Sequence, residues 1–198
     1  MRLVPHLMCQ TWRSRHSAQR SQTMAEIQDQ LEVGVEALTL TGEADGAFVK
    51  ELAEVLMRND SVRLLQLDRN ELQDDAAEAL AHALSVNSSI TSLDLDFNLI
   101  GDRGICRLAE ALEVNRGLQE LQLHCNRVGS AGTVRLGKAL KKNPTLRNLS
   151  LHGNPVKDLG ACALADALVP NVALRSLSLH AACITDVGAE YLAMSLEA

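Results

Sequence analysis

The stretches ITSLDLDFNLIGDRGICRLAEALEVNRG (90–117) and LQELQLHCNRVGSAGTVRLGKALKKNPT (118–145) align leucine with leucine at a period of 28 residues. A third copy, LRNLSLHGNPVKDLGACALADALVPNVA, continues the alignment at 146–173. Further copies in the same phase begin at Val35, Val62 and Leu174. Six tandem units therefore cover residues 35–198. A fixed period of this length indicates a repeat architecture in which each unit packs against its neighbours.

Each unit contains two hydrophobic patterns with different periods. Leu93 and Leu95 are separated by one polar residue, and this alternation predicts a short strand with the leucines pointing inward. Leu108 and Leu112 lie four residues apart further along the unit, which places them on one face of a helix. Every unit is therefore predicted to be a strand followed by a helix that packs back over it.

The L-x-x-L-x-L segment, the asparagine after it and the following helix resemble the ribonuclease-inhibitor-like class of leucine-rich repeat. NOD-like receptors and activators of the Ran GTPase contain repeats of this class. The resemblance covers residues 35–198, in units that start at 35, 62, 90, 118, 146 and 174. It implies an α/β leucine-rich repeat solenoid, a horseshoe with parallel strands on its concave face and helices on its convex face.

Three polar positions recur from unit to unit around these elements, and we call each such recurring position a column. The asparagines after the strands are expected to form a hydrogen-bonded ladder, as in other leucine-rich repeats: Asn70, Asn98, Asn126 and Asn154. Short polar residues before the helices are predicted to cap them: Asp74, Asp102, Ser130, Asp158 and Asp186. A left-handed backbone is expected where each helix ends, at Asn59, Asn87, Asn115, Asn143 and Asn171.

Composition and charge narrow the class of protein. The chain is 46% hydrophobic and 2% aromatic, it contains five cysteines without CxxC spacing, and no apolar run is long enough to span a bilayer. We therefore expect a cytoplasmic protein with free thiols. The net charge of −6 is unevenly distributed: residues 26–120 hold 7 basic and 20 acidic residues, whereas residues 121–198 hold 8 and 5. The acidic half is expected to steer basic partners.

Three segments lie at the ends of the repeat region. Residues 1–25 carry four arginines and no acid, and we interpret them as a basic, disordered N-terminal arm, with a mitochondrial transit peptide as the alternative. Residues 26–34 are predicted to form a capping helix. The last unit ends without a polar cap, so its apolar edge is expected to promote self-association.

The repeats also place histidines in one column on the concave face. His124, His152 and His180 are 28 residues apart, and Asp68 and Asp96 occupy the same column in earlier units. A linear ladder matches the tetrahedral geometry of zinc poorly, so we predict no metal and interpret these residues as part of a binding surface. The predicted partner-binding residues are Asp68, Arg69, Asp94, Asp96, Phe97, Glu120, Gln122, His124, His152 and His180.

The predicted function is protein recognition without catalysis. Residues 132–139, GTVRLGKA, come close to a phosphate-binding loop, but their residues fall in the helical columns of the repeat, so no nucleotide site is expected. We predict no catalytic residues, no cofactor, and no binding to nucleic acid or membrane. The expected partner is another protein with a basic segment. The alternatives are a GTPase-activating protein of the Ran-activator type and a repeat fragment of a NOD-like receptor.

Overall fold

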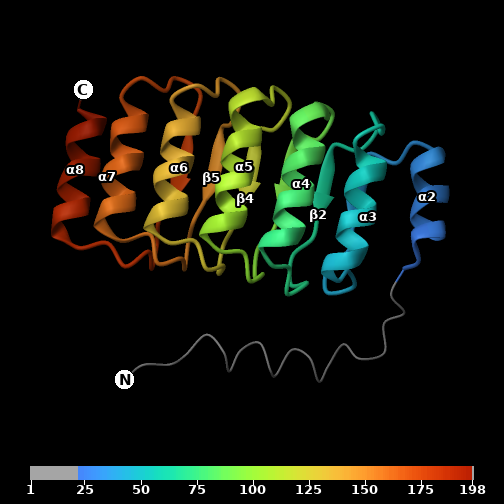
Figure 1. The fold of residues 1–198 in the computed structure, drawn as a ribbon. Helices are drawn as coiled ribbons and strands as arrows, with labels where there is room; N and C mark the ends of the chain where they lie inside the picture. The colour runs from blue at the N-terminus through green and yellow to red at the C-terminus, as the bar shows by residue number, and fades with distance from the viewer. Residues whose placement is uncertain (1–21, 198) are drawn as a thin grey trace.

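The computed structural model describes residues 22–197, in which strands and helices alternate along the chain (Figure 1). The strands are β1 (Ala37–Thr39), β2 (Leu64–Gln66), β3 (Ser92–Asp94), β4 (Glu120–Gln122), β5 (Asn148–Ser150) and β6 (Ser176–Ser178). The helices are α2 (Met24–Glu32), α3 (Gly46–Leu56), α4 (Asp74–Val86), α5 (Asp102–Val114), α6 (Ser130–Leu140), α7 (Lys157–Leu168) and α8 (Asp186–Leu196). Most of the predicted N-terminal arm lies outside the described residues.

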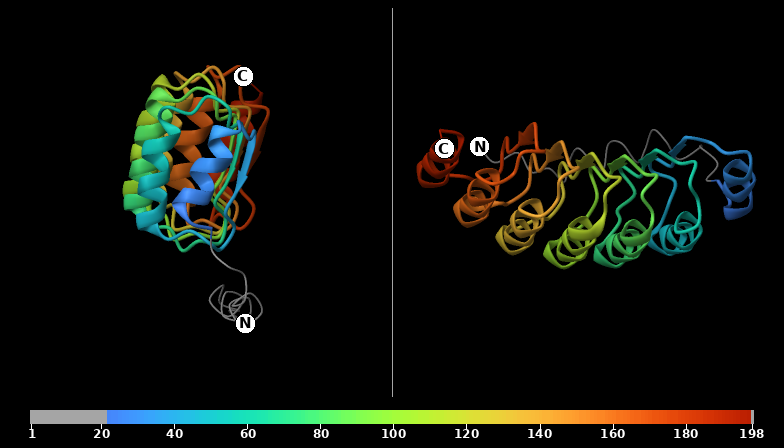
Figure 2. Two further views of the ribbon diagram at one scale, coloured as in Figure 1. Left: turned by 90° about the vertical axis from the view of Figure 1, so that its right-hand side faces the viewer. Right: turned by 90° about the horizontal axis from the view of Figure 1, so that it is seen from above.

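The six strands form one parallel sheet in the order β1 to β6, so each repeat pairs only with its neighbours. The register is constant: Leu65 pairs with Leu93, and Leu93 pairs with Leu121. Figure 2 shows the strands on the inner side of a shallow arc and the helices on its outer side. The predicted α/β leucine-rich repeat solenoid, with a concave sheet and convex helices, is confirmed.

The core lies between the sheet and the helices. In β2 to β5 the central leucine is buried and the residues on either side are half-buried, which is the alternation that the sequence predicts. Helical residues such as Leu108 and Leu112 close the other side of the core and are 1% exposed. Each unit therefore completes the core of its neighbour, which is how a solenoid buries apolar surface. No helix among residues 22–197 combines the length and apolar character that crossing a membrane requires.

The two ends of the solenoid differ. At the N-terminal end, α2 begins at Met24, because Thr23 and Glu26 exchange side-chain hydrogen bonds with each other's backbone in a capping box. Ile27 and Leu31 of α2 are buried. The sixth unit, by contrast, leaves its strand leucines only partly buried, and α8 exposes Tyr191, Met194 and Leu196.

The asparagines after the strands form the expected ladder, which we call the strand-end ladder (Asn70, Asn98, Asn126 and Asn154). Asn98 donates to the carbonyl of Leu67 in the preceding unit, 2.9 Å away, and accepts from the amide of Leu72 at 2.9 Å. Asn126 repeats the first of these bonds one unit later, to Leu95 at 2.8 Å. These bonds satisfy buried loop groups that would otherwise lack partners.

The asparagines at the helix ends form a second ladder, the helix-end ladder (Asn59, Asn87, Asn115, Asn143 and Asn171). The left-handed conformation expected there is wrong: Asn87 has φ −80° and ψ 127°, which is extended. The extended backbone lets each side chain bridge two units. Asn115 donates to the carbonyls of Leu84 and Asn87 and accepts from the amides of Gly117 and Leu118.

The polar residues before the helices also act differently from the prediction. Asp102 is the first residue of α5, and its carboxylate accepts from the amides of Gly129 (2.7 Å) and Gly132 (3.0 Å) at the start of the next helix. Asp74 bonds Gly101 of the following unit in the same way. Asp158 does the same to Thr185 and Gly188, so these three aspartates cap the start of the next helix, which the close stacking of units places within their reach. Ser130 instead donates to the carbonyl of Val156.

The helix-end ladder yields a prediction about stability. We expect Asn115→Ala to lower the free energy of unfolding by about 3 kcal/mol, because two amides, of Gly117 and buried Leu118, and two buried carbonyls lose their partners. Asn171→Ala removes the corresponding four bonds at a part-exposed site where water can replace them, so a loss of about 1 kcal/mol is expected. Denaturant unfolding measures both variants, and equal losses would contradict a role for burial.

Candidate functional site

The candidate site lies on the concave face of the sheet, which is opposite to the helices. Its residues come from the strands and from the two positions after the second leucine of each strand pattern, such as Asp96 and Phe97 after Leu95. Asp94 is the last residue of β3, and Asp96 and Phe97 follow it. The constant register places corresponding residues of successive units side by side. The site is therefore built of columns that run across the strands.

Four carboxylates, which we call the acidic cluster, gather on the second to fourth units: Asp68, Asp94, Asp96 and Glu120. Asp68 accepts a hydrogen bond from the Thr41 hydroxyl at 2.5 Å. Glu120 accepts from Ser92 at 3.3 Å and from the Asn148 amide at 2.8 Å. Side chains of adjacent strands thus hold the carboxylates in place, and the remaining lone pairs of each carboxylate can accept further donors.

Burial and mutual repulsion perturb the two central carboxylates. Burial raises the pKa of Asp94, and the negative charge of Asp68 adds to this effect. Burial likewise raises the pKa of Asp96 to about 6, with the charges of Asp94 and Asp68 acting in the same direction. The backbone amide of His124 donates to Asp96 at 2.6 Å and opposes the shift without cancelling it. The cluster therefore holds negative charge at an unfavourable site.

A continuous stack of planar groups, which we call the aromatic stack, lies beside the cluster and consists of Arg69, Phe97, His124, His152 and His180. The Arg69 guanidinium carbon lies 4.2 Å from the centre of the Phe97 ring. The ring centroids are 4.7 Å apart for Phe97 and His124, 4.0 Å for His124 and His152, and 4.7 Å for His152 and His180. One group per unit therefore continues the stack from the second unit to the sixth.

The backbone turns the first members of the stack toward their neighbours. Phe97 has φ 54° and Arg69 has φ 61°, and the equivalent residues Cys125 and Ala181 are also left-handed. This conformation is uncommon for non-glycine residues. It places the Phe97 ring between Arg69 of the preceding unit and His124 of the following unit. Phe97 is 39% exposed, so it offers a partner part of its ring and not a free side chain.

The environment of His124 disfavours its protonated form. Burial lowers the pKa of His124, and the neighbouring His152 and Arg69 add to the effect. The His124 Nδ1 lies 4.0 Å from Asp96. In the part of the chain that the structure describes, no group of three or more His, Cys, Asp or Glu side chains is arranged to hold a metal ion.

The structure brings the ten predicted partner-binding residues onto this one face, where their role in binding stays a prediction. Gln122 ends β4, beside Asp94 of β3. Sequence reasoning missed the hydrogen bonds that fix the carboxylates, although Thr41 stands in the column of Asp68 and signals such a contact. It also missed the ion pair between Arg69 and Asp68, whose Nε and carboxylate oxygen are 3.4 Å apart.

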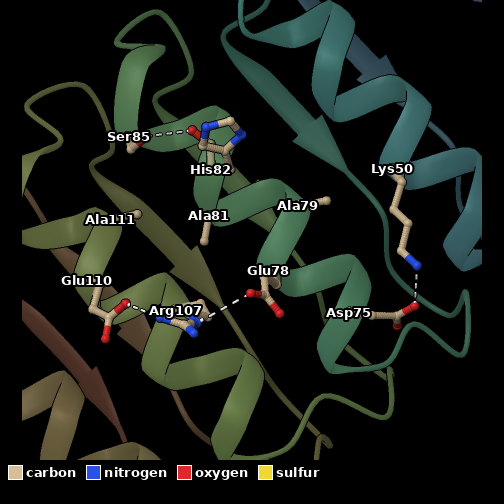
Figure 3. A pocket seen from close by; sticks show the side chains of 10 residues that line it. All are labelled: Lys50, Asp75, Glu78, Ala79, Ala81, His82, Ser85, Arg107, Glu110 and Ala111. Carbon is tan, nitrogen blue, oxygen red and sulfur yellow. Dashed lines mark hydrogen bonds and ion pairs between the residues drawn. The ribbon is translucent and has the colours of Figure 1, made fainter.

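A groove on the convex helices was also not predicted (Figure 3). It measures about 760 Å³ and lies over α4 and α5, with alanines between charged groups. Its charges neutralise each other: Lys50 bonds Asp75 at 2.6 Å, and Arg107 bonds Glu110 at 3.0 Å and lies 3.5 Å from Glu78. The groove therefore presents paired charges.

Comparison with known proteins identifies the repeats. A family model described as "TMOD/LMOD Leucine-rich domain" matches residues 41–135, and one described as "Leucine Rich repeat" matches residues 142–165. A search of curated proteins returned no matching relative.

Two solved structures resemble the chain. One is named "Leiomodin-1 Actin-Binding Site 2 (ABS2)"; it is 25% identical and has a TM-score of 0.56, over 65% of this chain and 79% of that chain. The tropomodulin C-terminal domain from Caenorhabditis elegans is 13% identical and has a TM-score of 0.51, over 85% of this chain and 88% of that chain. The latter likeness supports the fold alone.

The raised pKa of Asp96 yields a second prediction. The folded protein takes up this proton near pH 6, whereas the unfolded chain takes it up near the ordinary value of 3.8. The carboxylate therefore destabilises the fold above pH 6, and this penalty fades as the pH falls from 6 to 4. We expect Asp96→Asn, which can still accept from His124, to raise the free energy of unfolding at pH 7 by about 1 kcal/mol, allowing for solvent screening.

The measurement is denaturant unfolding at pH 7 and pH 4, with Asp166→Asn on α7 as an exposed control. The gain from Asp96→Asn should disappear at pH 4, while the control should behave like the wild type at both values. Destabilisation by Asp96→Asn at pH 7 would show that its charge supports the fold.

Proposed function

We propose that this chain, which is a leucine-rich repeat protein, binds its protein partner through the concave face of the sheet. It is an interaction module and not an enzyme. The observation that carries the proposal is the acidic cluster, whose carboxylates come from adjacent units and in which burial and neighbouring negative charge raise the pKa values of Asp94 and Asp96. Burying like charges together is unfavourable for an isolated chain, and such an arrangement is typical of a surface that meets a partner of opposite charge.

The partner is expected to supply a basic segment. A lysine or arginine beside Asp94 and Asp96 would favour their ionised forms, so the unfavourable repulsion in the free protein becomes attraction in the complex. The surrounding part of the chain, residues 26–120, carries a net charge of −13, which increases the rate of encounter with a basic surface.

The aromatic stack would supply the apolar contact beside this charge. Phe97 is already positioned between Arg69 and His124, so little side-chain entropy remains to be lost when a partner covers its exposed part. Preordered aromatic groups with charged neighbours are common at the centres of protein interfaces.

Actin is a specific candidate partner, because the leiomodin-1 structure that resembles this chain is named as an actin-binding site. The family match from residue 41 to residue 135 includes the acidic cluster and Phe97. Neither of the alternatives, a Ran-type GTPase activator or a repeat fragment of a NOD-like receptor, draws comparable support from the described residues.

Binding kinetics test the proposal. Actin and any protein that copurifies with the intact chain would be passed over immobilised chain at two ionic strengths. We expect Asp94→Asn with Asp96→Asn to lower the association rate about tenfold at low salt and less at high salt, because screening removes the steering field. Phe97→Ala should mainly increase the dissociation rate, by an amount equivalent to about 2 kcal/mol.

The matched control is Glu51→Gln with Glu54→Gln. Both residues are exposed on α3, and the pair changes the net charge by the same amount as the two concave substitutions. If the control slows association as much as the concave pair, only total charge matters and the concave face is not the site. A lack of actin binding would remove actin as the partner and leave the copurified protein to decide the question of the face.

The C-terminal end is a second candidate contact surface, for self-association. Tyr191, Met194 and Leu196 are 51%, 66% and 78% exposed on α8, and β6 is the outermost strand at this end of the sheet among the described residues. We propose that two copies meet there. Analytical ultracentrifugation should detect dimers at high concentration, and Tyr191→Glu with Met194→Glu should abolish them. Val86→Glu with Val114→Glu, at exposed sites on the central helices, should not.

A further inference from the structure

One column of the concave face changes its chemistry halfway along the solenoid. It is the column that follows the strand leucines, and it runs from the first unit to the sixth as Thr41, Asp68, Asp96, His124, His152 and His180. Carboxylates occupy it in the second and third units, and imidazoles occupy it from the fourth unit onward. The imidazoles belong to the aromatic stack, whose first two members, Arg69 and Phe97, stand in the next column.

A second column, at the edge of the sheet just before each strand, carries arginines in the last two units. Arg147 and Arg175 stand immediately before Asn148 and Ser176, the first residues of β5 and β6, and both arginines are exposed. Uncharged residues take this position before β3 and β4. The arginine before β2, Arg63, donates to the backbone carbonyl of Ser89 at 3.1 Å.

The remaining concave positions of the last two units are uncharged. They hold hydroxyl and amide groups: Asn148, Ser150, Ser176 and Ser178. The concave columns of the first four units carry five carboxylates and two arginines, which are Glu36, Asp68, Asp94, Asp96, Glu120, Arg63 and Arg69. The same columns in the last two units, counted with the position just before each strand, carry two arginines and no carboxylate. The concave face together with the sheet edge where the strands begin is thus negative at one end and positive at the other.

From this polarity we propose that the concave face binds an extended partner segment whose charge reverses along its length. The basic stretch of the segment lies over the second to fourth units, and an acidic stretch lies over Arg147 and Arg175. This inference rests on the proposed function and specifies the chemistry of the partner beyond a basic segment alone.

The size of the face sets the length of the segment. Strands β2 and β6 are four pairings apart, which corresponds to about 19 Å at the usual strand spacing. An extended chain covers this distance with about six residues. Three basic and three acidic residues in two blocks therefore match the two halves of the face.

The polarity would select register and direction. A segment shifted by three units would place its lysines beside Arg147 and Arg175, and such like-charge contacts are unfavourable. A partner with basic residues only would engage one half of the face and remain free to slide or turn. A segment with both blocks would bind in one position.

The inference can be tested with synthetic peptides at neutral pH and low ionic strength. The probe is a fluorescent peptide of three lysines, one glycine and three glutamates, and its reference is a peptide of the same composition with alternating charges. Fluorescence anisotropy would compare wild type, Arg147→Gln with Arg175→Gln, and Asp94→Asn with Asp96→Asn. Lys138→Gln with Lys141→Gln, at exposed positions of the α6 segment, matches the charge change of the arginine pair.

We expect the peptide with separate lysine and glutamate blocks to bind wild type about fivefold more tightly than the alternating peptide. The reason is that the small contributions of two exposed ion pairs at each end of the peptide add up. Replacing the two arginines should remove most of this advantage. Replacing the peptide glutamates with glutamine should remove it to the same extent, and both changes together should remove no more than either alone. The two α6 lysines should contribute nothing to it.

Three results would overturn the inference. They are equal affinity of the two peptides, insensitivity to Arg147→Gln with Arg175→Gln, or an equal effect from the α6 lysines. If the arginines have no effect while Asp94→Asn with Asp96→Asn still weakens binding, the concave face binds a basic segment only and the proposed function stands. If neither pair of substitutions affects binding of the peptides or of the copurified partner, both proposals fail.

Discussion

The fold depends on buried asparagine amides that connect each repeat to the one before it. Short strands and helices leave many loop amides and carbonyls inside the solenoid, and buried backbone groups without partners are strongly unfavourable. Asn98 satisfies such groups at one end of the sheet, and Asn115 satisfies them at the other. Because both ladders must stay in register at once, the number of residues between them is fixed. The constant 28-residue period of the central units is therefore a hydrogen-bonding constraint as much as a packing constraint.

The strand-end ladder also determines where the candidate site lies. The strand-end ladder requires a tight turn, and the residue before each ladder asparagine adopts a left-handed backbone, as at Arg69 and Phe97. That conformation directs the side chains of Arg69 and Phe97 toward neighbouring units, and the three histidines, each one residue before the left-handed position, continue the stack. The residues of the concave columns do not contribute to the core. They can therefore vary from unit to unit, which allows the charge of the face to change along the solenoid.

The period and the leucine pattern were sufficient to predict the architecture and the face on which the candidate residues lie. Cross-unit contacts were not predictable in the same way. Asp102 was expected to cap its own helix, and it caps the next one because the helices stack closely enough for its carboxylate to reach Gly129. The extended backbone of Asn87 and the raised pKa of Asp96 have the same origin, since each depends on how one unit meets another at the scale of single atoms. The recurrence of a residue type at one repeat position predicts a shared role, but it does not show which unit the side chain contacts.

Charged side chains are arranged differently on the convex and concave sides of the molecule. On the convex helices, opposite charges meet in ion pairs between neighbouring units, as for Lys50 with Asp75 and Lys142 with Glu113. Such pairs cancel at short range, so they contribute little to the field at a distance. The carboxylates of Asp94 and Asp96 instead lie close to each other and to Asp68, the positive charge of Arg69 opposes their repulsion, and burial keeps solvent from screening them fully. The electrostatic field on the approach to the concave sheet therefore arises mainly from the face that the fold leaves uncovered, where a partner can neutralise it.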